Sequence, residues 1–136
     1  PRAAHHGIPV AIHNHSRVDP NEYSHPDQFA AAMAQGDGRS IRVNLDIGHY
    51  TAANHDPVAY LRDHHEHIVT VHLKDRKRDE GPNTPWGEGD TAIGAVLTLL
   101  RDQRWDIPAN IEYEYQGGDT VEEMRRCFEF CKRALA

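Results

Sequence analysis

The feature that most constrains the fold of this chain is a fourfold alternation of short apolar strands with amphipathic helices. The predicted strands lie in the stretches 8–15, 41–50, 68–74 and 107–115, and a segment of helical periodicity follows each one. Strands that alternate with helices predict a parallel sheet with right-handed crossovers. We therefore expect an α/β fold of four consecutive βα units, which is half of a (β/α)8 TIM barrel.

The stretch 41–50 (IRVNLDIGHY) illustrates the design of these strands. Its aliphatic residues alternate with polar ones, as expected for a strand with two different faces. Asp46 ends the strand, Gly48 breaks it, and His49 follows on the way out, with a loop expected from Tyr50 to His55. The carboxyl ends of the strands are where α/β barrels place their chemistry.

The starts of the helices carry recognisable sequence signals. Pro26 suits the first turn of a helix, and Asp56 followed by Pro57 predicts an N-cap with proline at the first helical position. Asp119 and Glu122 resemble a capping box before the last helix. Between the third strand and the third helix lies the longest predicted loop, which we expect to be functional because of its length.

Length and charge limit the classes of function. With 136 residues, the chain is expected to form one domain, 1–136, and its formal net charge of -6 comes without a basic stretch interleaved with aromatics. We therefore expect no nucleic-acid partner. No apolar run approaches the ~20 residues of a membrane span, and no secretory leader is evident, so we expect no membrane partner and a cytoplasmic location.

Half a barrel has exposed edges that need a partner. Four units leave two strand edges unpaired and the polar inner face uncovered, which is unfavourable. The chain also begins at Pro1 without a methionine. We expect either that an N-terminal half is missing, so that 1–136 is the C-terminal half of an incomplete barrel, or that self-association completes the barrel.

Four polar residues near the strand ends form the candidate site. Each lies on the face opposite the aliphatic residues of its strand, and together they are His13, Asp46, His72 and Glu112. In a barrel this face looks into the lumen, so the four side chains should converge. Two imidazoles and two carboxylates suit Mn, Zn, Fe or Co, with Mg as a further candidate, better than Ca. Glu114 is the rival of Glu112 for the fourth ligand.

Two further residues are predicted to point to the same face of the sheet as these ligands. His15 follows His13 by two residues, and Lys74 follows His72 by two, so both are candidates for substrate binding. The alternative for His15 is a hydrogen-bonded loop histidine. The alternative for Lys74 is an ion pair at the barrel rim, for instance with Asp75.

The chain resembles the C-terminal half of the sugar phosphate isomerase/epimerase family, the xylose isomerase-like TIM barrels. The segments that carry the resemblance are VAIHNH, NLDIGH, VTVHLKD, WGEGD and ANIEYE, in family order. The resemblance implies that Asp46, His72 and Glu112 are metal ligands and that Glu112 also acts as acid/base. It further implies that His49 is a catalytic residue that hydrogen-bonds the substrate's oxygens, and that Arg78 binds substrate.

His13 departs from the family pattern, because sugar epimerases of this family usually have a glutamate at this position. Histidine can replace the ligand and can act as an acid or base near neutral pH. A two-glutamate epimerisation therefore becomes less favoured than one-base chemistry, which is isomerisation or elimination.

These observations predict a metal-dependent isomerase or epimerase that acts on a sugar or polyol. It would abstract a proton next to a carbonyl through a metal-stabilised enediolate. The first alternative is a dehydratase or lyase for keto-sugars or inososes on the same scaffold. Others are an endonuclease-IV-like phosphodiesterase, disfavoured by the net charge of -6, and a catalytically inert half barrel. The sugar, and whether it is phosphorylated, stay open.

Overall fold

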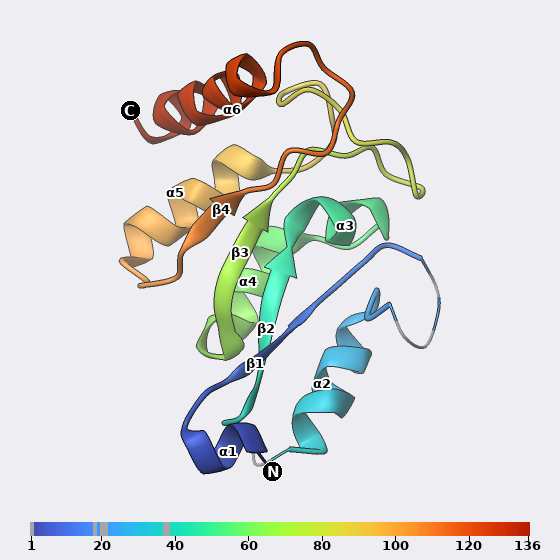
Figure 1. Cartoon of the computed structure of the whole chain (residues 1–136), viewed down its shortest axis with the longest axis vertical. Helices are drawn as coiled ribbons and strands as arrows, with labels where there is room; N and C mark the ends of the chain where they lie inside the picture. The colour runs from blue at the N-terminus through green and yellow to red at the C-terminus, as the bar shows by residue number, and fades with distance from the viewer. Residues whose placement is uncertain (1, 18, 20–21, 37–38) are drawn as a thin grey trace.

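The computed structural model describes residues 2–17, 19, 22–36 and 39–136, and it contains a parallel sheet whose strand order, β1-β2-β3-β4, follows the chain (Figure 1). The strands are β1 Val10–His13, β2 Ile41–Asp46, β3 Ile68–Leu73 and β4 Ala109–Ile111. The helices are α1 Arg2–His6, α2 Pro26–Ala34, α3 Ile47–Ala52, α4 Pro57–His64, α5 Ile93–Gln103 and α6 Thr120–Leu135, with a 3-10 turn η1 at His65–His67. The expected half of a (β/α)8 barrel is confirmed.

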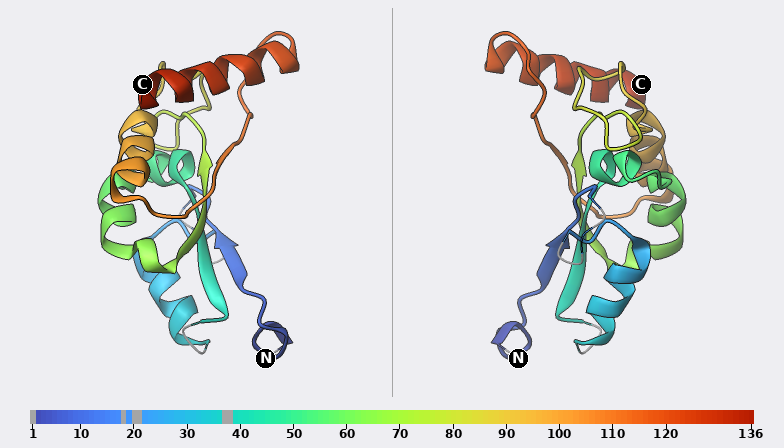
Figure 2. Two further views of the ribbon diagram at one scale, coloured as in Figure 1. Left: turned by 90° about the vertical axis from the view of Figure 1, so that its left-hand side faces the viewer. Right: turned by 90° about the vertical axis from the view of Figure 1, so that its right-hand side faces the viewer.

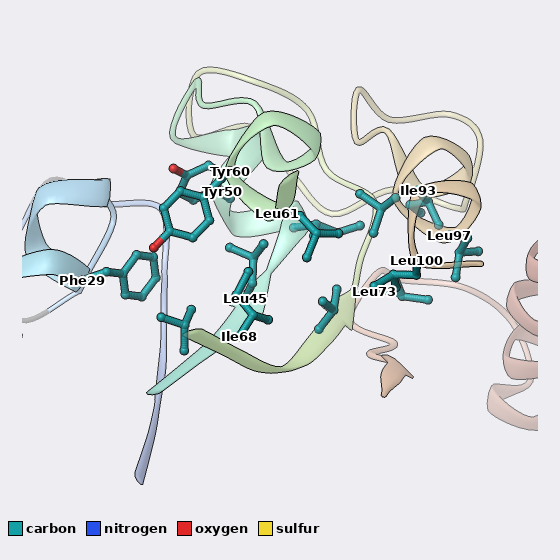
Figure 3. Close-up of a cluster of buried hydrophobic side chains, with 14 residues drawn as sticks. Phe29, Leu45, Tyr50, Tyr60, Leu61, Ile68, Leu73, Ile93, Leu97 and Leu100 are labelled. Atoms are coloured by element: carbon teal, nitrogen blue, oxygen red, sulfur yellow. The ribbon is translucent and has the colours of Figure 1, made fainter. Parts of the chain in front are cut away.

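The helices α2, α4 and α5 gather on one side of the sheet and leave the other side open (Figure 2). The alternation in β2 explains this arrangement, because Val43 and Leu45 are fully buried under the helices. Leu61 from α4 and Ile93 from α5 join the same core (Figure 3). The polar residues of the strands consequently point to the open face.

The predicted signals for the helix starts are largely confirmed. Pro26 is the first residue of α2, and the Asp56 carboxylate caps α4 by accepting hydrogen bonds from two backbone N–H groups. Asp119 caps α6 in the same way. The full capping box differs from expectation, because the Glu122 side chain forms an ion pair with Arg125 one turn later.

The prediction of a loop from Tyr50 to His55 is wrong in its first part, because helix α3 covers Ile47–Ala52. Asp46 ends the strand and is also the N-cap of this helix, accepting a hydrogen bond of 2.7 Å from the His49 backbone N–H. Gly48 allows the close approach of β3, because a Cβ at this position would lie 2.7 Å from the Lys74 carbonyl oxygen. His49 therefore sits in the first turn of a helix fixed to the sheet.

The two outer strands are shorter than predicted. β1 covers 10–13 instead of the whole of 8–15, and β4 covers 109–111 instead of 107–115. Each outer strand pairs with one neighbour among the described residues, so the backbone on its other side lacks a ladder to extend it. Regular pairing therefore ends early, although the Glu112 backbone N–H still donates to the Leu73 carbonyl at 2.9 Å.

One buried carboxylate organises the long loop between β3 and α5. Asp75 is 3% exposed and accepts hydrogen bonds from the backbone N–H groups of Gly87, Gly89 and Thr91. A Cβ at Gly89 would lie 1.9 Å from Asp75 Oδ1, so residue 89 must be glycine for this contact to form. Asp75 thus pins the loop to the end of β3.

Helix α6 packs on α5 and carries an exposed apolar stripe. Val121, Phe128 and Leu135 recur every seven residues and are exposed by 58%, 57% and 38%. The opposite side of the helix buries Glu123 and Cys127, with the Tyr115 hydroxyl donating to Glu123 at 2.7 Å. Across the described part of the chain, no helix has the length and apolar character needed to span a membrane.

Candidate metal centre

Four side chains meet on the open face of the sheet, at the carboxyl ends of its strands. They are His13 on β1, Asp46 on β2, His72 on β3 and Glu112 just after β4. One nitrogen or oxygen atom from each lies within 4.8 Å of those of the other three. The parallel register explains the convergence, since His13 lies beside Asn44, and Asp46 lies directly beside His72.

The contacts among these side chains alternate between acid and base. His13 Nε2 lies 3.3 Å from Asp46 Oδ2 and 3.9 Å from Glu112 Oε2. His72 Nδ1 lies 2.8 Å from the same Glu112 oxygen. The two imidazoles and the two carboxylates therefore enclose one small volume, and their donor atoms point into it.

Asp46 is the most rigidly held of the four. Its side chain is fully buried, and its backbone N–H and carbonyl both bond to the side-chain amide of Asn14. Burial acts to raise the pKa of this carboxyl. The hydrogen bond to His13 and the positive charges nearby outweigh burial and lower the pKa well below its usual range. Asp46 is thus a carboxylate across the physiological range.

Lys74 places a buried cation among the carboxylates. Its side chain is 2% exposed, and Nζ lies 3.1 Å from Asp46, 3.4 Å from Glu112 and 2.6 Å from Glu114. Burial acts to lower the pKa of Lys74, but the carboxylates prevail and raise it. Glu114, the rival for the fourth ligand, is outside the four-residue cluster and pairs with Lys74.

His49 lies between two cationic side chains. Its Nε2 is 3.0 Å from Lys74 Nζ, and its Nδ1 is 2.6 Å from an Arg76 guanidinium nitrogen. Burial lowers the pKa of His49 to about 4, with Lys74 and Arg76 acting in the same direction against Asp46. His49 is therefore a neutral hydrogen-bonding group near neutral pH.

Arg76 is a site residue that sequence reasoning missed. Its guanidinium also bonds Ser16 Oγ at 3.1 Å and the Gly81 carbonyl at 2.7 Å, so it links three segments around the site. The sequence does contain a signal for the position of Arg76, because this residue continues the alternation that places His72 and Lys74 on the open face. Arg78, the arginine selected from the sequence, is exposed, and its backbone N–H bonds Asp90. The structure does not bring Arg78 into the cluster.

His15 lies at the rim of the site. Its side chain is 51% exposed and its Nδ1 lies 2.5 Å from Glu22 Oε2. Its ring centre is 4.9 Å from that of His49 and 5.3 Å from that of His13. His15 is thus close enough to touch a ligand held between these rings.

The donor set of the cluster fits a divalent ion. Two imidazole nitrogens and two carboxylate oxygens are ligands that Mn, Zn, Fe and Co all accept, and their compact arrangement brings all four atoms within 4.8 Å. Asp46 is already deprotonated, as a ligand must be. The cluster could therefore hold such an ion.

Comparison with known proteins identifies the same fold. A sequence profile described as xylose isomerase-like TIM barrel matches residues 1–134. The inosose dehydratase of Lactiplantibacillus plantarum is 31% identical over 78 residues, which cover 57% of this chain and 25% of that protein.

Solved structures agree over nearly the whole chain. A 3-keto-D-glucoside 4-epimerase from E. coli matches with a TM-score of 0.77 and 16% identity, covering 96% of this chain and 48% of that one. A xylose isomerase domain protein from Planctomyces limnophilus matches with a TM-score of 0.74 and 21% identity, again covering 96% and 48%. The chain therefore spans about half the length of the solved structures, and the matched proteins include epimerases and dehydratases.

Proposed function

The chain belongs to the xylose isomerase-like TIM-barrel family, and from this premise we propose that it carries the metal centre and acid/base group of a sugar isomerase or epimerase. The observation that carries the proposal is the convergence of His13, Asp46, His72 and Glu112, whose donor atoms lie within 4.8 Å of one another. We propose these four as the ligands of a divalent ion. When bound, the ion would supply a Lewis acid to a carbonyl oxygen of the substrate.

Glu112 is the proposed base. Its carboxylate is 26% exposed on the open face, so it can reach a substrate that rests over the cluster. It would remove the proton from the carbon next to the carbonyl. Isomerisation then returns the proton to the neighbouring carbon, and epimerisation returns a proton to the same carbon on its opposite face. Before metal binds, the His72 contact at 2.8 Å holds this carboxylate in place.

His49, Lys74 and Arg76 are proposed to bind and orient the substrate's oxygens. The neutral His49 ring can accept from one of the two cations beside it and would donate its N–H to a substrate oxygen. The two cations offset the negative charge that forms as the proton leaves. We assign the guanidinium role to Arg76 in place of Arg78, because Arg76 contacts His49 beside the cluster and Arg78 is exposed. His15 is proposed to contact a hydroxyl group from the rim.

Dehydration of a keto-sugar or inosose is the second candidate reaction. It is favoured by the identity of 31% with the inosose dehydratase segment and by His13, which stands where a second glutamate would be needed for two-glutamate epimerisation. The same proton abstraction would then be followed by loss of a hydroxyl group from the β carbon. Ultraviolet absorbance of a conjugated product would identify dehydration, whereas solvent deuterium in an otherwise intact sugar would identify isomerisation or epimerisation.

We also propose that residues 1–136 form a single domain that four further βα units complete. The matched structures are about twice as long, and within the described part of the chain both outer strands have one unpaired edge. The other half would come either from the same polypeptide or from a second copy. Sedimentation of the chain alone separates these cases, because a dimer would indicate completion by a second copy.

Metal content tests the proposal directly. We would measure Mn, Zn, Fe and Co by elemental analysis in protein purified without chelator, beside Asp46→Ala and His72→Ala. Asp63→Ala, which removes an exposed carboxylate on α4, is the matched control. About one equivalent of metal, lost in both cluster variants and kept in the control, supports the centre. No metal in any of the four proteins after reconstitution would reject it and leave an inert half barrel.

A further inference from the structure

We propose that Asn44 is a positioning residue that turns His72 so that Nδ1, not Nε2, is the metal-binding nitrogen. The inference rests on the proposed metal centre and deepens it. Asn44 lies on β2, two residues before Asp46 and on the same open face, and it pairs in register with His13 and Thr70. It stands directly beside the His72 ring.

The two nitrogens of His72 have different neighbours. Nε2 lies 3.1 Å from the side-chain nitrogen of Asn44, and Nδ1 lies 2.8 Å from Glu112 Oε2. Nδ1 therefore points toward the other ligands, whereas Nε2 points sideways along the sheet. A metal held by all four residues would meet His72 on its Nδ1 side.

The hydrogen bonds fix which nitrogen carries the hydrogen in this arrangement. A neutral imidazole has one N–H and one acceptor nitrogen, and the Asn44 amide nitrogen can only donate. Nε2 therefore accepts from Asn44, and Nδ1–H donates to Glu112. This arrangement leaves the Asn44 carbonyl oxygen buried without a hydrogen-bond partner among the described residues.

Metal binding at Nδ1 requires the opposite hydrogen position. Nδ1 would release its proton to solvent and Nε2 would take one up, so the ring stays neutral. A half-turn of the Asn44 side-chain amide then places its oxygen where its nitrogen was, 3.1 Å from Nε2. This oxygen accepts the new Nε2–H, and the amide nitrogen takes the place that the oxygen leaves. Ligating histidines commonly donate their second N–H to such an acceptor.

Asn44 suits this role because its amide offers both a donor and an acceptor. A single half-turn serves the metal-free and the metal-bound ring, with no movement of the strand. An aliphatic residue of the same size could serve neither state, and a carboxylate could serve the metal-bound state alone. The geometry thus explains why a polar, partly unsatisfied side chain lies beside a ligand.

Nitrogen-15 NMR of the histidine rings tests the inference on the unaltered protein. Spectra would be recorded without metal and with Zn²⁺, and the His72 signals assigned by their loss in His72→Gln. We expect the hydrogen on Nδ1 without metal and on Nε2 with Zn²⁺. A zinc-loaded protein with the hydrogen still on Nδ1 would overturn the inference.

Zn²⁺ affinity of three variants gives a second readout. Asn44→Leu should weaken binding about 10- to 100-fold, the usual effect of losing such a partner. Asn44→Asp restores an acceptor and should lose less. Asn110→Leu is the matched control, because Asn110 lies on the neighbouring strand beside His72 and donates to Thr70 instead.

The outcomes separate this inference from the proposed function. If the unaltered protein binds no Zn²⁺, the metal centre itself fails. If it binds Zn²⁺ with equal affinity in Asn44→Leu and the control, the metal centre stands and the role of Asn44 is rejected. If Asn44→Asp is as weak as Asn44→Leu, the hydrogen-bond explanation is likewise rejected.

Discussion

The two central strands and the two outer strands of the sheet differ in how completely the chain surrounds them. β2 and β3 pair on both sides, and their residues Val43, Leu45 and Val71 are fully buried. β1 and β4 pair on one side among the described residues, and Val10 on β1 is 53% exposed. The aliphatic residues of the two central strands therefore lie in a buried core, whereas the outer strands remain partly exposed to solvent.

The candidate metal centre draws equally on these two regions. Asp46 and His72 come from the central strands, and His13 and Glu112 from the outer strands. Asp46 is fully buried, whereas the side chains of His13 and Glu112 are 28% and 26% exposed. Asp46 is therefore fixed by the core of this chain, whereas His72 on the other central strand is 27% exposed, much like the two ligands at the margins. The ligands at the margins depend on strands that further units would cover.

The largest effect of this difference between central and outer strands is expected for a substitution in the core. Leu45→Ala removes a fully buried side chain of β2 and should lower the free energy of unfolding by about 3–5 kcal/mol. Urea denaturation measures the change. A loss below about 1 kcal/mol would show that the central strands are not the stable core described above.

A second large loss of stability is expected when the buried cation of Lys74 is removed. Lys74→Met leaves the fully buried Asp46 carboxylate without its nearest positive charge, at a cost of about 3 kcal/mol in metal-free protein. The value lies at the low end of the range for broken buried ion pairs because Glu112 and Glu114 remain partly exposed. Lys77→Met, which loses an exposed pair with Asp90, is the control and should cost less than about 1 kcal/mol. Equal losses in urea denaturation would contradict the prediction.

The protonation of His49 should make the metal-free protein less stable in mild acid. Below about pH 6.5 the unfolded chain binds a proton on this ring, whereas the folded protein resists protonation until about pH 4. The unfolded state binds more protons in this window, so the free energy of unfolding falls as the pH falls, by at most about 3 kcal/mol.

Unfolding measurements from pH 7 to pH 4 test this expectation. His49→Gln should show a shallower dependence on pH than the unaltered protein. His6→Gln, which removes an exposed ring on α1, serves as the matched control. Parallel curves for the unaltered protein and His49→Gln would contradict the assignment.

The smallest effect is expected at the margin of the sheet. Val10→Ala on β1 should change the free energy of unfolding by no more than about 0.5 kcal/mol, because the side chain is already 53% exposed. A loss close to that of Leu45→Ala would reveal that another chain covers β1 in solution. Repeating the measurement at several protein concentrations would identify such a partner as a second copy.

The sequence predicted the strand centres and the direction of the polar residues well, because both depend on local alternation. The buried Val43 and Leu45, and the opposite placement of Asp46, follow from a period of two that tertiary contacts reinforce. Strand ends were predicted less well. β1 and β4 end where their pairing ends, and pairing depends on neighbours that alternation within one strand does not report.

Local pattern was not sufficient to predict two features of the site. The sequence does not predict helix α3, because its six residues are too few to show helical periodicity and its start relies on a cap by Asp46. Arg78 was expected from the family resemblance, and alternation does not separate Arg76 from Arg78, because the loop's course decides which arginine turns inward. That course is set by contacts with Ser16 and Gly81, which lie on two different loops.

The hydrogen bonds that Asp75 accepts from the long loop have a consequence for how this fold can be engineered. The carboxylate that follows Lys74 holds the backbone at Gly87, Gly89 and Thr91, so the far end of the loop is tied to the strand that carries His72. A graft of this loop into another barrel would have to transfer 75–91 as one cassette. Shuffling at a point inside the cassette would separate the carboxylate from the amides it binds, while junctions in β3 and α5 would keep them together.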